Sequence, residues 1–226
     1  MDTNIKSRRR GRPSLENEQP VDDDKCLQQA LDVFAELGYE GTSVRELARR
    51  LNISHGLLNA RYGSKRDLWE AAFDRGMIRL LEHMSGLEQP FDPEADTVEQ
   101  FRQACMNFLL GLMESPSIIK VMNIEGTRKT DRLEHVVNKF FRDEIWPFDV
   151  LLRKGQAEGV FRDIHQAVPF MLLAHGAGAL IALRPLVELV DYELGKESGG
   201  LMCSAEEAAD VILRGVLAEP AKPKCL

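Results

Sequence analysis

The chain has 226 residues, of which 44% are hydrophobic and 29% are charged, and its formal net charge is −7. This hydrophobic content is sufficient for a packed core of one or two domains. The negative net charge argues at first against a nucleic-acid partner, but the charge is unevenly distributed. Residues 1–70 contain 12 Lys+Arg and 12 Asp+Glu, so the remaining 17 basic and 24 acidic residues account for the whole −7.

The first segment, residues 1–22, is polar and rich in breakers, and we expect it to be a disordered basic arm. It contains Arg-Gly-Arg-Pro, which is similar to the core of an AT-hook, whose arginines enter a narrow minor groove. The alternative is a solvated arm that contacts phosphates only. The arginines concerned under both interpretations are Arg8, Arg9, Arg10 and Arg12.

The next segment carries an apolar stripe at helical spacing from Cys26 to Leu37, and Gly38 ends the predicted helix. Two short helices with a tight turn between them follow. Ser43 is an N-cap with Glu46 three residues later, which is the spacing of a capping box.

Asn52 tolerates the left-handed conformation that a tight turn needs, and Ser54 can cap a second helix that runs from His55 to about Tyr62. Gly63 ends this helix and Ser64 opens a third. A helix, a short turn and a helix form the arrangement that places its second helix in the major groove of DNA.

The spaced residues of this region resemble the DNA-binding domain of the TetR family of transcriptional regulators. The resemblance runs from about Asp24 to Phe73, and the rest of the chain matches only in length and helical character. It rests on Gly38-Tyr39-Glu40-Gly41-Thr42-Ser43-Val44, Leu47-Ala48, Asn52-Ile53-Ser54-His55-Gly56-Leu57-Leu58 and Tyr62-Gly63-Ser64-Lys65-Arg66-Asp67-Leu68. The family usually has an aromatic residue at the position of Asn59 and an aromatic residue or His at Arg61, so Arg61 is expected to replace the usual tyrosine–phosphate contact.

The resemblance implies an all-α fold, with an N-terminal three-helix helix-turn-helix domain and a C-terminal helical bundle for ligand binding and dimerisation. We expect the arm at 1–22, the DNA-binding domain at 23–70, the ligand-binding and dimerisation domain at 71–218 and a tail at 219–226. In the second short helix, His55, Leu57 and Asn59 suit contacts with base edges, and Gly56 permits close approach of the backbone. Lys65 and the amides of the next helix are expected to hold a phosphate. The complete set of candidate DNA contacts adds Ser43, Arg45, Ser54, Arg61, Tyr62 and the four arginines of the arm.

The remaining segments all read as helices. A long helix from Ser64 to about Ser85 is shared by the two domains and is followed by helices at Thr97 to Glu114 and after Pro116. We then predict a long helix from about Asp131 to Glu158 with a kink at Pro147. Another helix is expected from Asp163 to about Val190, and a last helix is expected to be capped by Ser204.

Met and Phe side chains of these helices, with one Trp and one His, are candidates for a mostly apolar ligand pocket. The alternative is that they are ordinary core residues, and that His175 is a hydrogen-bonded core histidine. The candidates are Phe101, Phe108, Met113, Met122, Trp146, Met171 and His175. Gly176-Ala177-Gly178-Ala179 are small enough for a close helix contact, either in a two-fold interface or inside one subunit.

No nucleophile elbow, phosphate-binding glycine loop or HExxH pair occurs, so we expect no enzyme and no cofactor. His83, His135 and His165 are expected at the surface. The longest apolar run, Ala167 to Leu183, is interrupted by Pro169 and is short of the ~20 residues of a membrane span.

The four cysteines, Cys26, Cys105, Cys203 and Cys225, form no CxxC pair, and we expect buried thiols in a cytoplasmic protein. Together these features predict a homodimeric regulator, a repressor that a small apolar or amphipathic effector releases from a palindromic operator in double-stranded DNA. The alternative is a helical DNA-binding or adaptor protein that is controlled by a protein partner.

Overall fold

The computed structural model describes residues 22–85, 92, 94–142, 146–190 and 198–218, and this part of the chain is helical without a strand. The helices are α1 (Asp23–Gly41), α2 (Val44–Arg50), α3 (His55–Tyr62), α4 (Lys65–Met84), α5 (Thr97–Glu114), α6 (Pro116–Glu125), α7 (Asp131–Phe140), α8 (Pro147–Ala157), α9 (Ala167–Met171), the π-helix η2 (Leu172–Ala177), α10 (Gly178–Ala182), α11 (Arg184–Val190) and α13 (Ser198–Val216). The predicted all-α fold is confirmed.

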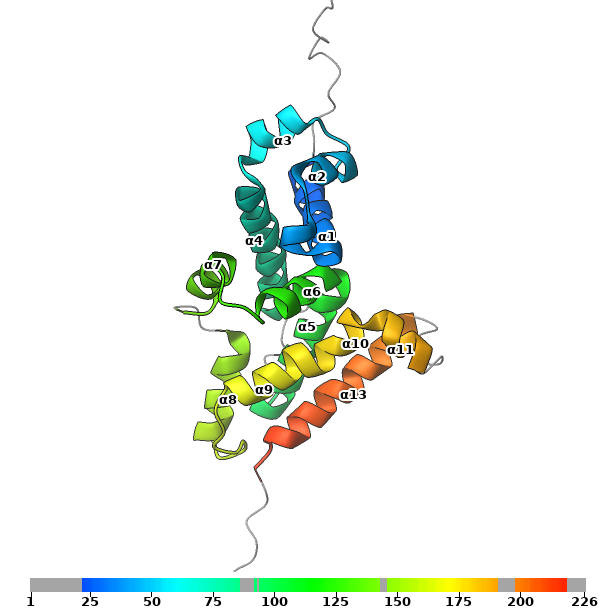
Figure 1. Ribbon diagram of the computed structural model, residues 1–226. Coiled ribbons are helices and arrows are strands. Elements are labelled where there is room, and N and C mark those ends of the chain that lie inside the picture. Colours follow the sequence, from blue (N-terminus) through cyan, green and yellow to red (C-terminus); the bar gives the residue numbers. More distant parts are fainter. Residues whose placement is uncertain (1–21, 86–91, 93, 143–145, 191–197, 219–226) are drawn as a thin grey trace, which may run out of the picture.

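The helices α1, α2 and α3 lie at one end of the elongated molecule, and α9, α10 and α13 lie towards the other (Figure 1). The helix α4 begins beside α3 and runs into the body, where it packs on α5. Its apolar face is fully buried, and Trp69 stacks on Phe73 with 5.1 Å between ring centroids. One helix is therefore part of the packing of both ends.

Glycine allows α4 to approach its neighbours closely. A Cβ atom on Gly76 would lie 2.9 Å from Cδ2 of Leu31 in α1 and 2.6 Å from Cδ1 of Ile118 in α6. Both of those side chains are buried, so they have little room to move. Gly76 therefore fixes how tightly α1, α4 and α6 pack.

Three predicted helix boundaries are wrong. Pro147 starts α8 instead of kinking one long helix, because its missing N–H is tolerated in the first turn. The predicted helix from Asp163 to Val190 begins at Ala167 and bends by 71° between α10 and α11, since Pro185 cannot continue the preceding turn. Ser204 is no cap: its hydroxyl donates to the carbonyl of Gly200 inside α13 at 2.9 Å.

The Ser43 capping box is only half formed. Ser43 Oγ accepts from the Glu46 amide at 3.1 Å. The Glu46 carboxylate instead accepts hydrogen bonds from Arg49 and Arg50. These bonds, of which the Arg49 bond has the largest effect, lower the pKa of Glu46 to about 2. The Ser64 box is complete, since Asp67 Oδ2 accepts from the Ser64 amide at 2.8 Å.

We expect the Gly76→Ala substitution to destabilise the protein by about 1–2 kcal/mol, because the overpacking cost exceeds the gain in helix propensity. Gly215→Ala is the matched control, since a Cβ atom there meets nothing within 4 Å. Chemical denaturation of both variants measures the difference. A Gly76→Ala protein as stable as the control would contradict the tight packing at α4.

Candidate nucleic-acid interface and effector cavity

The turn between α2 and α3 is built as its residues predict. Asn52 has φ 53°, which confirms the left-handed turn position. The Ile53 amide donates to the Ala48 carbonyl at 3.1 Å, and Ser54 Oγ accepts from the Leu57 amide at 3.1 Å. The cap of α3 is therefore made by Ser54, and the start of α3 is held to the end of α2.

The helix α3 has distinct inner and outer faces. Leu58 is completely buried and Tyr62 is half-buried, whereas His55, Gly56 and Asn59 are exposed and Leu57 is half-buried. A Cβ atom on Gly56 would meet nothing within 4 Å. The outer face is therefore uncovered in the described chain, at the end of the molecule farthest from α13 (Figure 1).

The C-terminal end of α3 is tied to α1. The Tyr62 hydroxyl donates to Asp23 Oδ1 at 2.6 Å, and Arg61 Nε donates to the same oxygen at 3.0 Å. These two bonds, of which the Tyr62 bond has the larger effect, lower the pKa of Asp23 below its usual value. Arg61, which we predicted as a phosphate contact, is thus engaged by a carboxylate of the protein itself.

Lys65 is also more engaged than the sequence indicates. Its Nζ donates to the carbonyls of Tyr39 at 2.9 Å and Thr42 at 3.0 Å, and it lies 4.0 Å from the centroid of the Tyr39 ring. Two of its three N–H donors are used inside the protein. Lys65 therefore has one N–H donor left for a phosphate. At the same end of α4, the Ser64 amide already donates to the Asp67 carboxylate.

Of the remaining candidate contacts, Arg45 is exposed on α2 and forms no ion pair within the described residues. The neighbouring Arg50 is instead paired with Glu36 of α1 at 2.6 Å. Arg8, Arg9, Arg10 and Arg12 lie outside the described residues. Beside α3, the exposed Arg45 and the half-buried Lys65 are therefore the candidate cations for a phosphate, whereas the exposed Arg49 is paired with Glu46.

A cavity of about 520 Å³ lies between α4, α5, α6, α7 and η2. Five of the seven predicted ligand-binding side chains line it: Phe108, Met122, Trp146, Met171 and His175. Phe101 is not among the lining residues, because its ring packs on Phe148 at 4.6 Å in the core. Met113 also lies outside the lining, one position beyond Leu112, which does line the cavity.

Several further residues line the cavity that the sequence pattern does not indicate, among them Asn123, Leu133, Phe141 and Phe170. His175, which lies in the π-helix η2, shares a hydrogen bond of 2.7 Å with Asn123 of α6, and burial lowers its pKa. A polar residue in an otherwise apolar run was the available signal for His175. Asn123 gave no comparable signal, because only the packing of η2 on α6 brings the two together.

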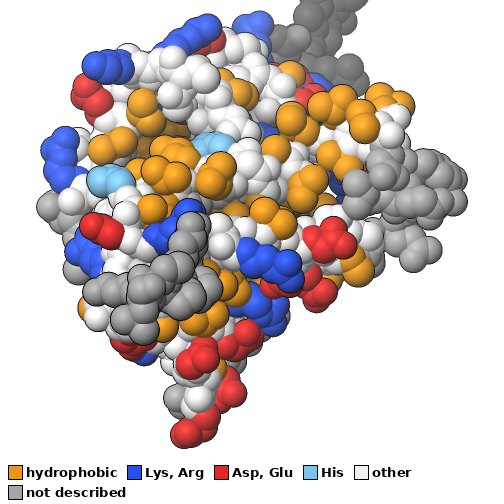
Figure 2. Space-filling model, turned by 90° about the horizontal axis from the view of Figure 1, so that it is seen from below, with side chains coloured by type: hydrophobic (Ala, Val, Ile, Leu, Met, Phe, Trp, Pro, Cys, Tyr) orange, Lys and Arg blue, Asp and Glu red, His pale blue; other side chains and the backbone are white. Residues whose placement is uncertain are grey.

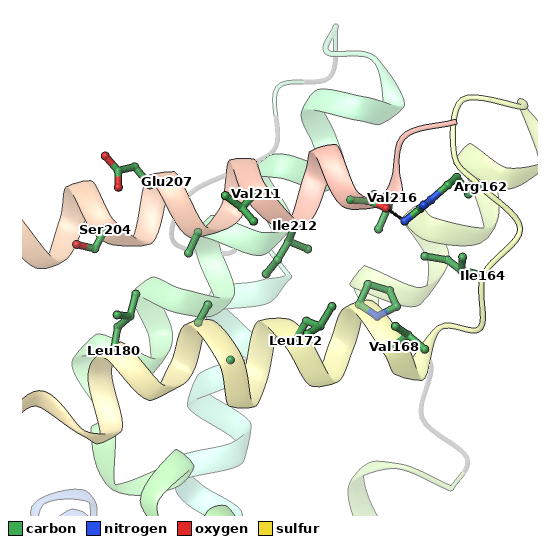
Figure 3. Close-up of a pocket in the computed structure, with 15 residues that line it drawn as sticks. Arg162, Ile164, Val168, Leu172, Leu180, Ser204, Glu207, Val211, Ile212 and Val216 are labelled. Carbon is green, nitrogen blue, oxygen red and sulfur yellow. Dashed lines mark hydrogen bonds between the residues drawn. The ribbon is translucent and has the colours of Figure 1, made fainter. Parts of the chain in front are cut away.

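An apolar groove of about 640 Å³ runs between α13 and the α9–η2–α10 segment (Figure 3). Val168 and Leu172 line one side and Val211 lines the other, and each is more than half exposed. Figure 2 shows hydrophobic side chains spread over this end of the molecule. The groove is therefore a large apolar surface that the described chain leaves uncovered.

The small residues of η2 and α10 have two different surroundings. A Cβ atom on Gly176 would meet nothing within 4 Å, and Gly176 lines the groove. Gly178 is buried, and a Cβ atom there would lie 3.3 Å from Leu112 and 3.4 Å from Ile119. The close contact inside the subunit and the open surface thus lie on opposite sides of one segment.

Two predicted surface histidines are in fact largely enclosed. His83 Nε2 lies 2.9 Å from Glu114 Oε2, and His135 Nε2 lies 2.8 Å from Asp74 Oδ1. Cys26 and Cys105 are buried as predicted, whereas Cys203 is exposed. Within the described residues no group of three or more His, Cys, Asp or Glu side chains is arranged to hold a metal ion.

No single described helix is long and apolar enough to cross a membrane. The segment Ala167–Ala182 reaches the length and apolar composition of a membrane span only together with α11, and the two are bent by 71° relative to each other.

We expect Tyr62→Phe to raise the pKa of Asp23, because the phenol hydroxyl is the largest cause of its lowering. A carboxyl pKa below the unfolded value stabilises the fold at neutral pH, and this contribution is lost as pH falls through the folded pKa. The substitution should therefore weaken the pH dependence of stability on the acid side. An NMR titration of the Asp23 carboxyl measures this, with Asp24, which pairs with Arg75, as the internal control. An unchanged Asp23 pKa would refute the bond.

The sequence model described as "Bacterial regulatory proteins, tetR family" matches residues 27–72. Over 46 residues the chain is 48% identical to YezE of Bacillus subtilis, an uncharacterized HTH-type transcriptional regulator. The matched stretch covers 20% of this chain and 24% of YezE. It is 44% identical over 48 residues to the HTH-type transcriptional repressor Rv3405c of Mycobacterium tuberculosis, 21% of this chain and 26% of that protein. The matches thus span about a quarter of each relative's length.

Solved structures match over most of the chain. The TetR-family regulator HI0893 of Haemophilus influenzae has a TM-score of 0.62 at 18% identity and covers 86% of this chain and 96% of its own. The TetR-family regulator PfmR of Thermus thermophilus has a TM-score of 0.58 at 21% identity, with 84% and 97% covered. The N-terminal domain of the chain thus matches the tetR family model, and the fold of its described length is similar to that of solved TetR-family regulators.

Proposed function

We propose that the protein is a homodimeric DNA-binding transcriptional regulator, a repressor that a small apolar or amphipathic effector releases from a palindromic operator. The observation that carries this proposal is that α3 has a buried inner face and an exposed outer face. Leu58 and Tyr62 hold the helix from inside, while His55, Gly56 and Asn59 are exposed on a surface that the described chain leaves uncovered. A short helix held in this way can enter the major groove without losing its own packing.

The contacts fall into two classes. Asn59 can make two hydrogen bonds to adenine, His55 can bond a base edge, and Leu57 can touch a thymine methyl group. Arg45 and the remaining donor of Lys65 would contact phosphates, which sets register but not sequence. Arg61 would contribute only where its bond to Asp23 exchanges for a phosphate oxygen.

The groove between α13 and the α9–η2–α10 segment supports a two-fold dimer. Its apolar walls would be covered by the same surface of a second copy, as closed symmetry requires. Two recognition helices about one helical turn of DNA apart, ~34 Å, would then read the two halves of a palindrome.

The cavity supports the effector part of the proposal. It is lined by apolar side chains from several helices, and two of these, Met77 and Leu80, belong to α4. One of the helices that border the cavity is therefore the helix whose first turn adjoins α3. An effector that prefers one position of α4 would shift the spacing of the two recognition helices, provided that its affinity differs between the two states.

We expect Asn59→Ala to relax the preference at one base position in each half-site, at a cost of about 1–3 kcal/mol if the contact is bidentate. Asn59 is exposed and packs on nothing essential, so the fold should be unaffected. Selection of bound duplexes from random DNA by both proteins measures the change. If both select the same motif, Asn59 does not read a base, and if the wild type selects no motif, the proposed function is wrong.

We expect Asp23→Asn to strengthen binding to any duplex at low salt by roughly three- to tenfold, because the loss of the carboxylate charge weakens its bond to Arg61 and lets a phosphate compete for that side chain. Asp24→Asn is the matched control. It makes the same change of charge one residue away, but Asp24 pairs with Arg75 and Arg79 of α4 and not with α3. Fluorescence anisotropy on a labelled duplex compares them. Equal gains in both variants would mean that Arg61 makes no phosphate contact.

A further inference from the structure

Arg132, at the start of α7, joins three other helices. Its guanidinium carbon lies 3.9 Å from the centroid of Tyr39, near the end of α1, and 5.9 Å from that of Trp69 in α4. Its Nε donates to Glu125 Oε1 of α6 at 3.0 Å. The Arg132 side chain is only 15% exposed and that of Glu125 only 5%. The side chain of Arg132 is therefore held in one place from several directions.

The Tyr39 ring is shared with Lys65. Arg132 of the body and Lys65 of the DNA-binding domain both lie within 4.0 Å of its centroid, each attracted by the electron-rich ring. Lys65 also donates to the Tyr39 carbonyl. Tyr39 therefore contacts the Lys65 ammonium through both its carbonyl and its ring, and the Thr42 carbonyl accepts a second hydrogen bond.

We propose that Arg132 is a positioning residue for the phosphate contact of Lys65, acting through the ring of Tyr39. This inference rests on the proposed function, since it assumes that Lys65 meets DNA. Arg132 touches no DNA itself. It holds the ring against which the Lys65 ammonium is aligned.

The same residue is next to the effector cavity. Leu133 follows Arg132 and lines the cavity, and Gly126 and Thr127 follow Glu125 and also line it. The Thr130 hydroxyl donates to Glu125 Oε2 at 3.2 Å, which ties the loop between α6 and α7 to the same ion pair. Since separating a buried ion pair is costly, Arg132 and Glu125 move together with this loop. The ion pair beside Tyr39 therefore adjoins the lining of the cavity.

The test is a double-mutant cycle on the salt dependence of DNA binding by the full chain. Arg132→Met is combined with Glu125→Gln, so that no buried carboxylate is left unpaired, and this variant is compared with Lys65→Met and with the combination of all three. The probe is a duplex of random sequence at a series of low salt concentrations, and thermal unfolding checks that each variant is folded. Lys139→Met is the matched control, because Lys139 ties α7 to Asp74 and does not contact Tyr39.

We expect the Arg132 variant to flatten the slope of log affinity against log salt by about 0.9 per subunit, as Lys65→Met does, with no further loss when the two are combined. Lys139→Met should keep the wild-type slope. A wild-type slope in the Arg132 variant, or losses that simply add in the combined protein, would overturn the positioning role while DNA binding by the wild type leaves the proposed function intact. A wild-type protein that binds no duplex would refute both.

Discussion

An eight-residue helix is not stable alone in water, and the candidate function of this protein depends on such a helix. The helix α3 is held at three points. Ser54 caps its first turn, Leu58 is buried in its middle, and Tyr62 with Arg61 binds Asp23 at its end. These contacts are all on the inner side or at the ends, so the outer side needs no partner within the protein. The outer face of α3 can stay uncovered because the contacts that stabilise the helix lie on its inner face and at its two ends.

The two ends of the molecule are connected by close packing and by charge. The helix α4 forms part of the core at both ends, and Gly76 lets it lie directly on α1 and α6. Around it, polar pairs cross between helices: Asp24 with Arg75, and Asp74 with His135 and Lys139. Each of these surface pairs contributes little stability. The helices α6 and α7 thus contact α1 and α4 at several points.

The local features of the N-terminal region were predictable from the residues. The caps Ser54 and Ser64, the left-handed Asn52, the non-helical conformation of Gly38 inside α1 (φ 69°) and the burial of Leu58 all depend on residues within a few positions of one another. Boundaries in the body were less predictable, since an apolar helical pattern continues across Pro147 and Pro185 although the backbone does not. Five of the seven predicted pocket residues line one cavity, because apolar residues of successive helices share one interior. Phe101 does not line the cavity because its ring packs on Phe148 in the core, a contact that the sequence pattern does not indicate.

The sequence by itself therefore determined the helical class, the helix-turn-helix and the outward residues of α3, because capping, left-handed turns and helical periodicity are short-range properties. Only the tertiary structure decided what the charged side chains do. Arg61 is paired with Asp23, Lys65 is shared between two carbonyls and a ring, and His175 meets Asn123, in each case across at least 23 positions of sequence. A charge or a polar group has no preferred direction along the chain, and its partner is chosen by whichever helix packs beside it.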